Sequence, residues 1–357
     1  MKLAARGPIA VVMVAALAAC QGGDLLQIVK SLSTEATICM AGYRFGPSRN
    51  AACYYTVTAK TAKATGIDLG GSAYGEASAC AIAFSGGIVY NAGYYLSSTR
   101  YVACYWTNDE KSDLPGGVAP NGARALSIFV SGQTVHVAGC WHNGTKYVAC
   151  LWANGVKTDL VGGSGDACAN SIFVSGGVVY TAGYWNNGTR DVPCYWKDGT
   201  KVDLPAGTGS ARVNSISVVA GTVYAAGYYN NGTRDVPCCW KDGAKTDLPA
   251  GSGGASACSI CVSGGSVYAA GYYGNGARDV PCYWKDGSKT DFPDGGTAAH
   301  ACSICILGGT VYVAGYHGNG SMDAGCYWKG DQGPNDIGGG VCRLYSICEG
   351  PGVVSEL

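Results

Sequence analysis

The stretch SIFVSGGVVYTAGYWNNGTRDVPCYWKDGTKVDL, residues 171–204, recurs along the chain with few changes. Four short apolar runs in it are separated by Gly-Gly, Asn-Gly and Asp-Gly pairs, which favour the positive φ of hairpin turns. An Ala-Gly step marks each copy, and its glycines are Gly42, Gly93, Gly139, Gly183, Gly227, Gly271 and Gly315. Successive steps are 51, 46, 44, 44, 44 and 44 residues apart, a period typical of propellers and solenoids. The repeat of about 44 residues predicts an all-β fold in which each copy is a blade of four antiparallel strands.

The two ends of the chain distinguish a closed ring from an open solenoid. The first copy begins at its second strand, near residues 37–43, and the chain ends with an unmatched first strand at residues 345–348. One end supplies the strand that the other lacks, and pairing them removes the edges that an open array has to cap. We expect a seven-bladed β-propeller over residues 34–357, with its first blade closed by the C-terminal strand.

The order of strands in the repeat resembles the kelch type of β-propeller. An apolar first strand is followed by a second strand such as VYVAG, residues 311–315, and by a third strand that ends in an aromatic residue. The chain has Ala-Gly where kelch units carry a Gly pair, and its period is shorter, so the resemblance implies a topology and no partner or activity. The repeat is also similar to those of uncharacterised bacterial lipoproteins rich in Tyr-Trp-Lys-Asp-Gly segments.

The N-terminus has the pattern of a secretory signal. Basic residues precede an apolar stretch at residues 9–19, which ends in Leu-Ala-Ala followed by Cys20 and resembles the bacterial lipobox. We expect residues 1–19 to be a signal peptide, Cys20 to be lipidated, and residues 20–33 to form a short tether. Several acyl chains would anchor the protein to a membrane of the bacterial cell envelope. By resemblance to enterobacterial lipoproteins, Gln21 favours the outer membrane and leaves the periplasmic or surface face open.

The charge of the chain argues against a nucleic acid partner. Its 24 basic and 24 acidic residues give a formal net charge of zero, and only 13% of residues are charged. Such a chain has no field that would gather phosphates.

Seven of the 19 cysteines share one position in the third strand. They are Cys53, Cys104, Cys150, Cys194, Cys238, Cys282 and Cys326. This regular placement predicts packing as small apolar side chains. Disulfides within one blade, for example among Cys258, Cys261 and Cys282, remain open. No regular His or Asp accompanies the cysteines, so no metal ligands and no cofactor are expected.

One position varies within a nearly constant background, four residues before each first-strand isoleucine. Its residues are Ser78, Arg124, Cys168, Arg212, Ser256, His300 and Arg343. If the first strand is innermost, they ring one mouth of the central channel. There Arg124, Arg212, His300 and Arg343 would favour an anionic group.

A second row of candidate residues lies two positions past each Ala-Gly glycine. It comprises Arg44, Tyr95, Trp141, Trp185, Tyr229, Tyr273 and His317. The turn that follows should open on the same face as the variable position. Trp141, Trp185, Tyr229 and Tyr273 could then hold a sugar or an extended peptide, while packing between blades is the other interpretation.

The sequence favours a non-catalytic function. Its four histidines fall at different positions of the repeat, and no catalytic residues stand out. We expect a lipid-anchored binding or scaffold protein of the cell envelope that holds a protein or an anionic glycan at one propeller face. The alternative is an envelope glycoside hydrolase or lyase with its site at the channel mouth, by analogy of fold alone. A structural or antigenic surface protein is the third hypothesis.

Overall fold

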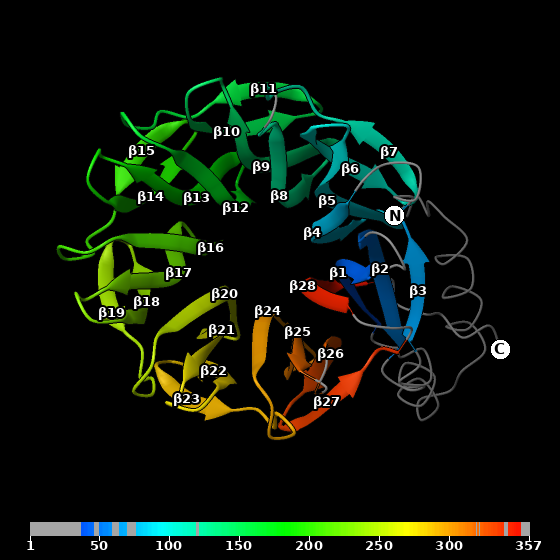
Figure 1. Cartoon of the computed structure of the whole chain (residues 1–357), viewed down its shortest axis with the longest axis vertical. Helices are drawn as coiled ribbons and strands as arrows, with labels where there is room; N and C mark the ends of the chain where they lie inside the picture. Colours follow the sequence, from blue (N-terminus) through cyan, green and yellow to red (C-terminus); the bar gives the residue numbers. More distant parts are fainter. Residues whose placement is uncertain are drawn as a thin grey trace, which may run out of the picture.

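The computed structural model describes residues 37–45, 50–58, 64–69, 76–118, 121–318, 320, 322–338 and 342–350. All regular elements in these ranges are β-strands, which form seven four-stranded antiparallel sheets arranged around a central axis (Figure 1). The predicted seven-bladed β-propeller is confirmed. The signal peptide, Cys20 and the tether lie outside the described residues. Within the described ranges, no helix is long and apolar enough to cross a membrane.

The first strand of every blade is innermost, as expected, and surrounds the axis in Figure 1. Blade 1 contains β1, and blades 2 to 7 follow in the order of the sequence. The inner strands of blades 2 to 7, followed by that of blade 1, are β4 (Ala77–Ser85), β8 (Ala123–Ser131), β12 (Ala167–Ser175), β16 (Ala211–Val219), β20 (Ala255–Ser263), β24 (Ala299–Leu307) and β28 (Cys342–Glu349). In the same order, the second strands are β5 (Ile88–Ser97), β9 (Thr134–His142), β13 (Val178–Asn186), β17 (Thr222–Asn230), β21 (Ser266–Gly274), β25 (Thr310–Gly318) and β1 (Thr37–Phe45).

The third and fourth strands complete each blade toward the rim. The third strands are β6 (Arg100–Thr107), β10 (Tyr147–Ala153), β14 (Asp191–Lys197), β18 (Asp235–Lys241), β22 (Asp279–Lys285), β26 (Asp323–Lys329) and β2 (Asn50–Thr58). The outer strands are β7 (Glu110–Asp113), β11 (Val156–Asp159), β15 (Thr200–Asp203), β19 (Ala244–Asp247), β23 (Ser288–Asp291), β27 (Gln332–Asp336) and β3 (Ala64–Asp68).

Blade 1 is built from both ends of the chain. Its strand order is β28-β1-β2-β3, so the last strand of the sequence is the inner strand of the first blade. β28 pairs antiparallel with β1, from Ile38 opposite Glu349 to Arg44 opposite Cys342. The predicted closure by the C-terminal strand is therefore confirmed.

Serine side chains join most neighbouring inner strands. In six of the seven seams, the Oγ of a serine just before the inner-strand isoleucine accepts a hydrogen bond from the backbone N–H of the isoleucine in the next blade, at 3.1–3.2 Å. Between blades 2 and 3 the serine position holds Ala81. These bonds satisfy buried backbone donors and fix the position of each inner strand against its neighbour.

The third strands fill the space between blades. Their cysteines are at most 1% exposed, which confirms that this set packs as small apolar side chains. In blades 2 to 7 the residue two positions later is a tryptophan, which is also buried, and in five of these blades its Nε1 donates to a carbonyl of the linker that enters the blade. The acceptors are the carbonyl oxygens of Pro115, Val161, Pro205, Pro249 and Pro293, at 2.8–2.9 Å. A buried indole therefore ties each of these blades to the linker from the preceding one.

Candidate functional site

The variable position lies at the start of each inner strand. Its seven residues, Ser78, Arg124, Cys168, Arg212, Ser256, His300 and Arg343, are called the inner row below. In blade 5, Arg212 stands opposite Tyr228 on β17, and the turn from β17 to β18 lies at the same end of the sheet. The prediction that this turn opens on the face of the inner row is confirmed. A bulge follows the inner-row residue in each blade, as between Val213 and Ser215, and such bulges re-aim neighbouring side chains.

The structure adds a set of tyrosines that the sequence interpretation missed. They occupy the position directly after each Ala-Gly glycine, opposite the inner row, and are called the tyrosine row. Its members are Tyr43, Tyr94, Tyr184, Tyr228, Tyr272 and Tyr316, with Cys140 in blade 3. The available signal was alternation, since adjacent strand residues point to opposite faces of a sheet. The tyrosines therefore share a sheet face with the inner row, whereas the residues one position later do not.

Two predicted cationic residues form ion pairs between neighbouring blades. Arg212 on β16 donates through Nε to Oδ2 of Asp191 on β14 at 2.8 Å, and its guanidinium lies 4.0 Å from the centre of the Tyr184 ring. Arg343 on β28 repeats this arrangement with Asp323 on β26 and with the tyrosine of that blade. Each arginine is thus neutralised by a carboxylate of the preceding blade and stacked on its tyrosine.

His300 is held between two rings of the tyrosine row. Its ring centre is 3.8 Å from that of Tyr272 and 5.0 Å from that of Tyr316, to which it is nearly parallel at 14°. Its Nε2 is 2.9 Å from Oδ2 of Asp279 in the preceding blade. Burial lowers the pKa of His300, although Asp279 acts in the opposite direction. The histidine therefore occupies the site of an inter-blade ion pair and is held mainly in its neutral form.

We expect His300 to make folding less stable in acid. Because the folded pKa of His300 lies below its ordinary value, the unfolded chain binds the proton more readily, and stability falls as the pH drops from 7 to 5. Asp279, Asp323 and Arg343 are the charged groups around the ring. Urea unfolding at each pH should show a smaller loss in His300→Gln than in the wild type, by up to about 1.4 kcal/mol per pH unit. Identical pH profiles would contradict this assignment.

Arg124 on β8 differs from the other cationic residues of the inner row. The preceding blade offers Tyr101 at the position where blades 4 to 7 have aspartate, and the guanidinium lies 4.7 Å from the centre of this ring. It also lies 5.5 Å from the ring centre of Tyr94 and 5.9 Å from that of Tyr147. Among the described residues, no carboxylate pairs with Arg124, and its buried Nε makes no hydrogen bond. Its cross-strand partner is Cys140, which is smaller than the tyrosine of other blades.

The predicted aromatic residues are engaged within their own blades. Trp141 and Trp185 donate through Nε1 to Asp159 and Asp203 at 2.8 Å, and Tyr229 and Tyr273 donate their hydroxyls to aspartates at the same position of their outer strands. In each case a lysine two residues before the aspartate lies over the ring, 3.4–3.7 Å from its centre.

The linkers between blades pack against these aromatic rings. A Cβ added at Gly163 would come within 2.2 Å of the Trp185 ring, and one at Gly251 within 2.5 Å of the Tyr273 ring. The geometry thus matches the packing interpretation given above. The two predicted rows lie at the same end of the propeller but on opposite faces of each sheet, so the structure does not bring them into one site. Their role in ligand binding remains a prediction.

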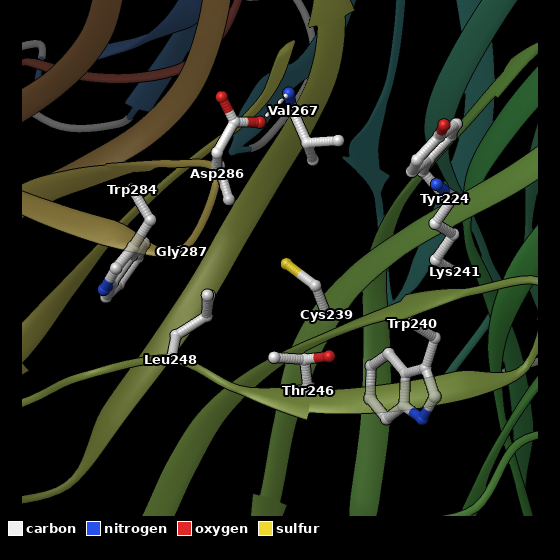
Figure 2. Close-up of a pocket in the computed structure, with 11 residues that line it drawn as sticks. Tyr224, Cys239, Trp240, Lys241, Thr246, Leu248, Val267, Trp284, Asp286 and Gly287 are labelled. Atoms are coloured by element: carbon white, nitrogen blue, oxygen red, sulfur yellow. Dashed lines mark hydrogen bonds between the residues drawn. The ribbon is translucent and has the colours of Figure 1, made fainter. Parts of the chain in front are cut away.

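A pocket of about 230 Å³ opens between blades 5 and 6, at the end of the propeller opposite to the inner row (Figure 2). Cys239 lies at its centre, between Thr246 and Val267 in the close-up. The neighbouring blades carry Tyr195 and Tyr283 at the position of Cys239. The smaller side chain therefore accounts for the opening, which lies away from the inner row.

Metal binding finds no support among the residues that the structure describes, because they contain no group of three or more His, Cys, Asp or Glu side chains placed to hold an ion. The aspartates at the start of the third strands are also engaged: Asp191 and Asp323 pair with an arginine of the next blade, Asp279 contacts His300, and Asp235 accepts a hydrogen bond from Asn230. The hydrolase or lyase hypothesis remains a prediction.

Comparison with known proteins identifies the fold and no family. No family model matches the chain, and no curated protein does. It is similar to a Trypanosoma rangeli sialidase in complex with sialic acid, at 10% identity and a TM-score of 0.45, over 81% of this chain and 50% of that one. The chain thus spans half the length of that sialidase.

A second solved structure matches the chain over nearly its own whole length. The β-propeller domain of the Trilobed protease from Pyrococcus furiosus is similar at 8% identity and a TM-score of 0.51, over 85% of this chain and 98% of that one. That domain is described as having an open velcro topology, whereas β28 closes blade 1 here. At this identity the likeness shows the propeller fold alone.

Proposed function

We propose that this protein is a non-catalytic binding protein of the bacterial cell envelope, anchored through Cys20, which holds a carboxylated glycan at Arg124. The observation that carries the proposal is the state of Arg124, a half-buried guanidinium without a carboxylate partner in the described part of the chain. A ligand carboxylate would supply the counter-charge that aspartates supply to Arg212 and Arg343.

The surroundings of Arg124 favour an acidic sugar. Tyr94, Tyr101 and Tyr147 place three aromatic rings within 6 Å of the guanidinium. Aromatic faces beside a fixed charge suit a sugar ring that carries a carboxylate, because the ring packs on the aromatic face while the charge sets its orientation. Arg212 and Arg343 have the same residue type but already pair with aspartates, which makes Arg124 the best available anion partner in the inner row.

Binding to matched glycans tests the proposal. The purified protein, residues 24–357, is titrated with uronic-acid oligosaccharides and with the same oligosaccharides after reduction of their carboxyl groups. We expect binding of the acidic set only, and a loss of about 10–100-fold in affinity in Arg124→Ala, because a hydrogen bond to a charged group contributes about 1.5–3 kcal/mol.

Arg212→Ala is the matched control, since it removes the same charge from a residue already paired with Asp191. We expect it to retain most of the affinity. Equal binding by Arg124→Ala and wild type would refute the assignment to Arg124. A wild-type protein that binds none of the glycans would turn the search toward a protein ligand, beginning with pull-down from envelope extract.

A further inference from the structure

The two ends of the propeller meet at a pair of cysteines. Cys39 on β1 and Cys348 on β28 are direct Cα partners in the antiparallel ladder of blade 1. Cys39 has no exposed surface, and Cys348 packs from the neighbouring strand against the same apolar cluster between blades 1 and 2. The thiols are thus cross-strand neighbours in the one sheet that is assembled from opposite ends of the chain.

The repeat shows that this pair is specific to blade 1. The same cross-strand position in the other blades, from blade 2 to blade 7, holds Ala83 and Tyr90, Phe129 and His136, Phe173 and Tyr180, Ser217 and Tyr224, Cys261 and Tyr268, and Cys305 and Tyr312. None of these is a pair of cysteines. The tyrosine that the repeat favours on the second strand gives way to Cys39 where β1 meets the returning end of the chain.

The geometry suits a covalent bond. Cross-strand partners in antiparallel sheets have Cα atoms about 4.5–5.5 Å apart. Disulfides need a Cα separation of about 4.4–6.8 Å, so the ladder of blade 1 already provides it. A hydrogen bond from the Cys348 thiol also lowers the pKa of Cys39, which favours Cys39 as the attacking thiolate. The segment that follows β28 also lies close to Cys39, because a Cβ added at Gly350 would be 2.6 Å from the Sγ of Cys39.

We propose that a disulfide between Cys39 and Cys348 closes the propeller covalently. The oxidant is a disulfide-bearing thiol compound, such as oxidised glutathione or an oxidised thiol oxidoreductase. The Cys39 thiolate attacks one sulfur of the oxidant and releases the first thiol; Cys348, after losing its proton, displaces the second. Two electrons pass to the oxidant, which becomes two thiols, and one S–S bond replaces two S–H bonds. This inference is independent of the proposed ligand.

The full-length chain, refolded with oxidised and reduced glutathione, provides the test. Proteolysis without reductant should give a peptide containing Cys39 linked to one containing Cys348, two hydrogens lighter than their sum. Because the bond closes a loop of nearly the whole propeller, we expect Cys348→Ser to lower the Tm by about 5–10 °C. Cys305→Ser is the matched control, since Cys305 is at the same inner-strand position of blade 7 and faces Tyr312. It should keep both the linked peptide and the Tm.

If the Cys348→Ser variant fails to fold, the Tm of the wild type treated with reductant is measured in its place. Its Tm should fall by about 5–10 °C. Where Cys348→Ser does fold, reductant should leave the Tm of that variant unchanged. Absence of the linked peptide in the oxidised protein, or linkage of Cys39 to a different cysteine, would overturn the proposal.

Discussion

Replacing Trp196 with alanine should lower the free energy of unfolding by about 3–5 kcal/mol. Trp196 is fully buried between blades 3 and 4, and its Nε1 donates to the carbonyl of Val161 in the linker at 2.8 Å. Alanine would leave a cavity and would also leave a linker carbonyl without its donor. Urea unfolding followed by far-ultraviolet circular dichroism measures the loss.

Trp196→Phe separates the two contributions. Phenylalanine keeps much of the buried ring and removes the hydrogen bond, so we expect a smaller loss of about 1–3 kcal/mol. If the alanine variant lost less free energy of unfolding than the phenylalanine variant, packing of the indole would not stabilise the contact between these blades.

Gly183→Ala should be about as damaging, with a loss of about 4 kcal/mol or more. A Cβ at this glycine would lie 1.9 Å from the carbonyl oxygen of Cys168, a backbone atom of the facing strand β12. No side-chain rotation relieves this contact, so the two strands would have to separate. The comparison is again made by urea unfolding of the variant and the wild type.

Gly254→Ala is the control for this change, because a Cβ there meets nothing within 4 Å. We expect its stability to stay within about 0.5 kcal/mol of the wild type. A tolerant Gly183 would show that β12 and β13 do not approach as closely as the structure has them. The other Ala-Gly glycines have the same contact, with distances of 1.9–2.0 Å to the facing carbonyl. This contact explains why the glycine recurs in every blade.

The fold was predictable from the sequence because its determinants are local and repeated. Turn dipeptides mark the hairpins, the 44-residue spacing marks the blades, and the unmatched strand at residues 345–348 indicates the closure. The site was less predictable, because it depends on contacts between blades. Asp191 and Arg212 are 21 positions apart, on strands of different sheets, and their pairing follows from how neighbouring blades stack.

The inner row, too, could be predicted only in part from the sequence. Its position on one face follows from strand order alone, but its variety has two origins. Arg212, His300 and Arg343 occur where the preceding blade supplies an aspartate, whereas Arg124 occurs where it supplies Tyr101. The sequence interpretation treated the four cations as equivalent, and only the stacking of blades separates them.

The closure of blade 1 bears on how the number of blades could change during evolution. Blade 1 combines β28 with β1 to β3, while each of the other six blades is built from one contiguous segment. A duplication or deletion of one 44-residue unit within the gene would add or remove a whole blade and leave both ends as they are. The pairing of β28 with β1 would then be the same in propellers with more or fewer blades, so this pairing does not itself determine that there are seven blades.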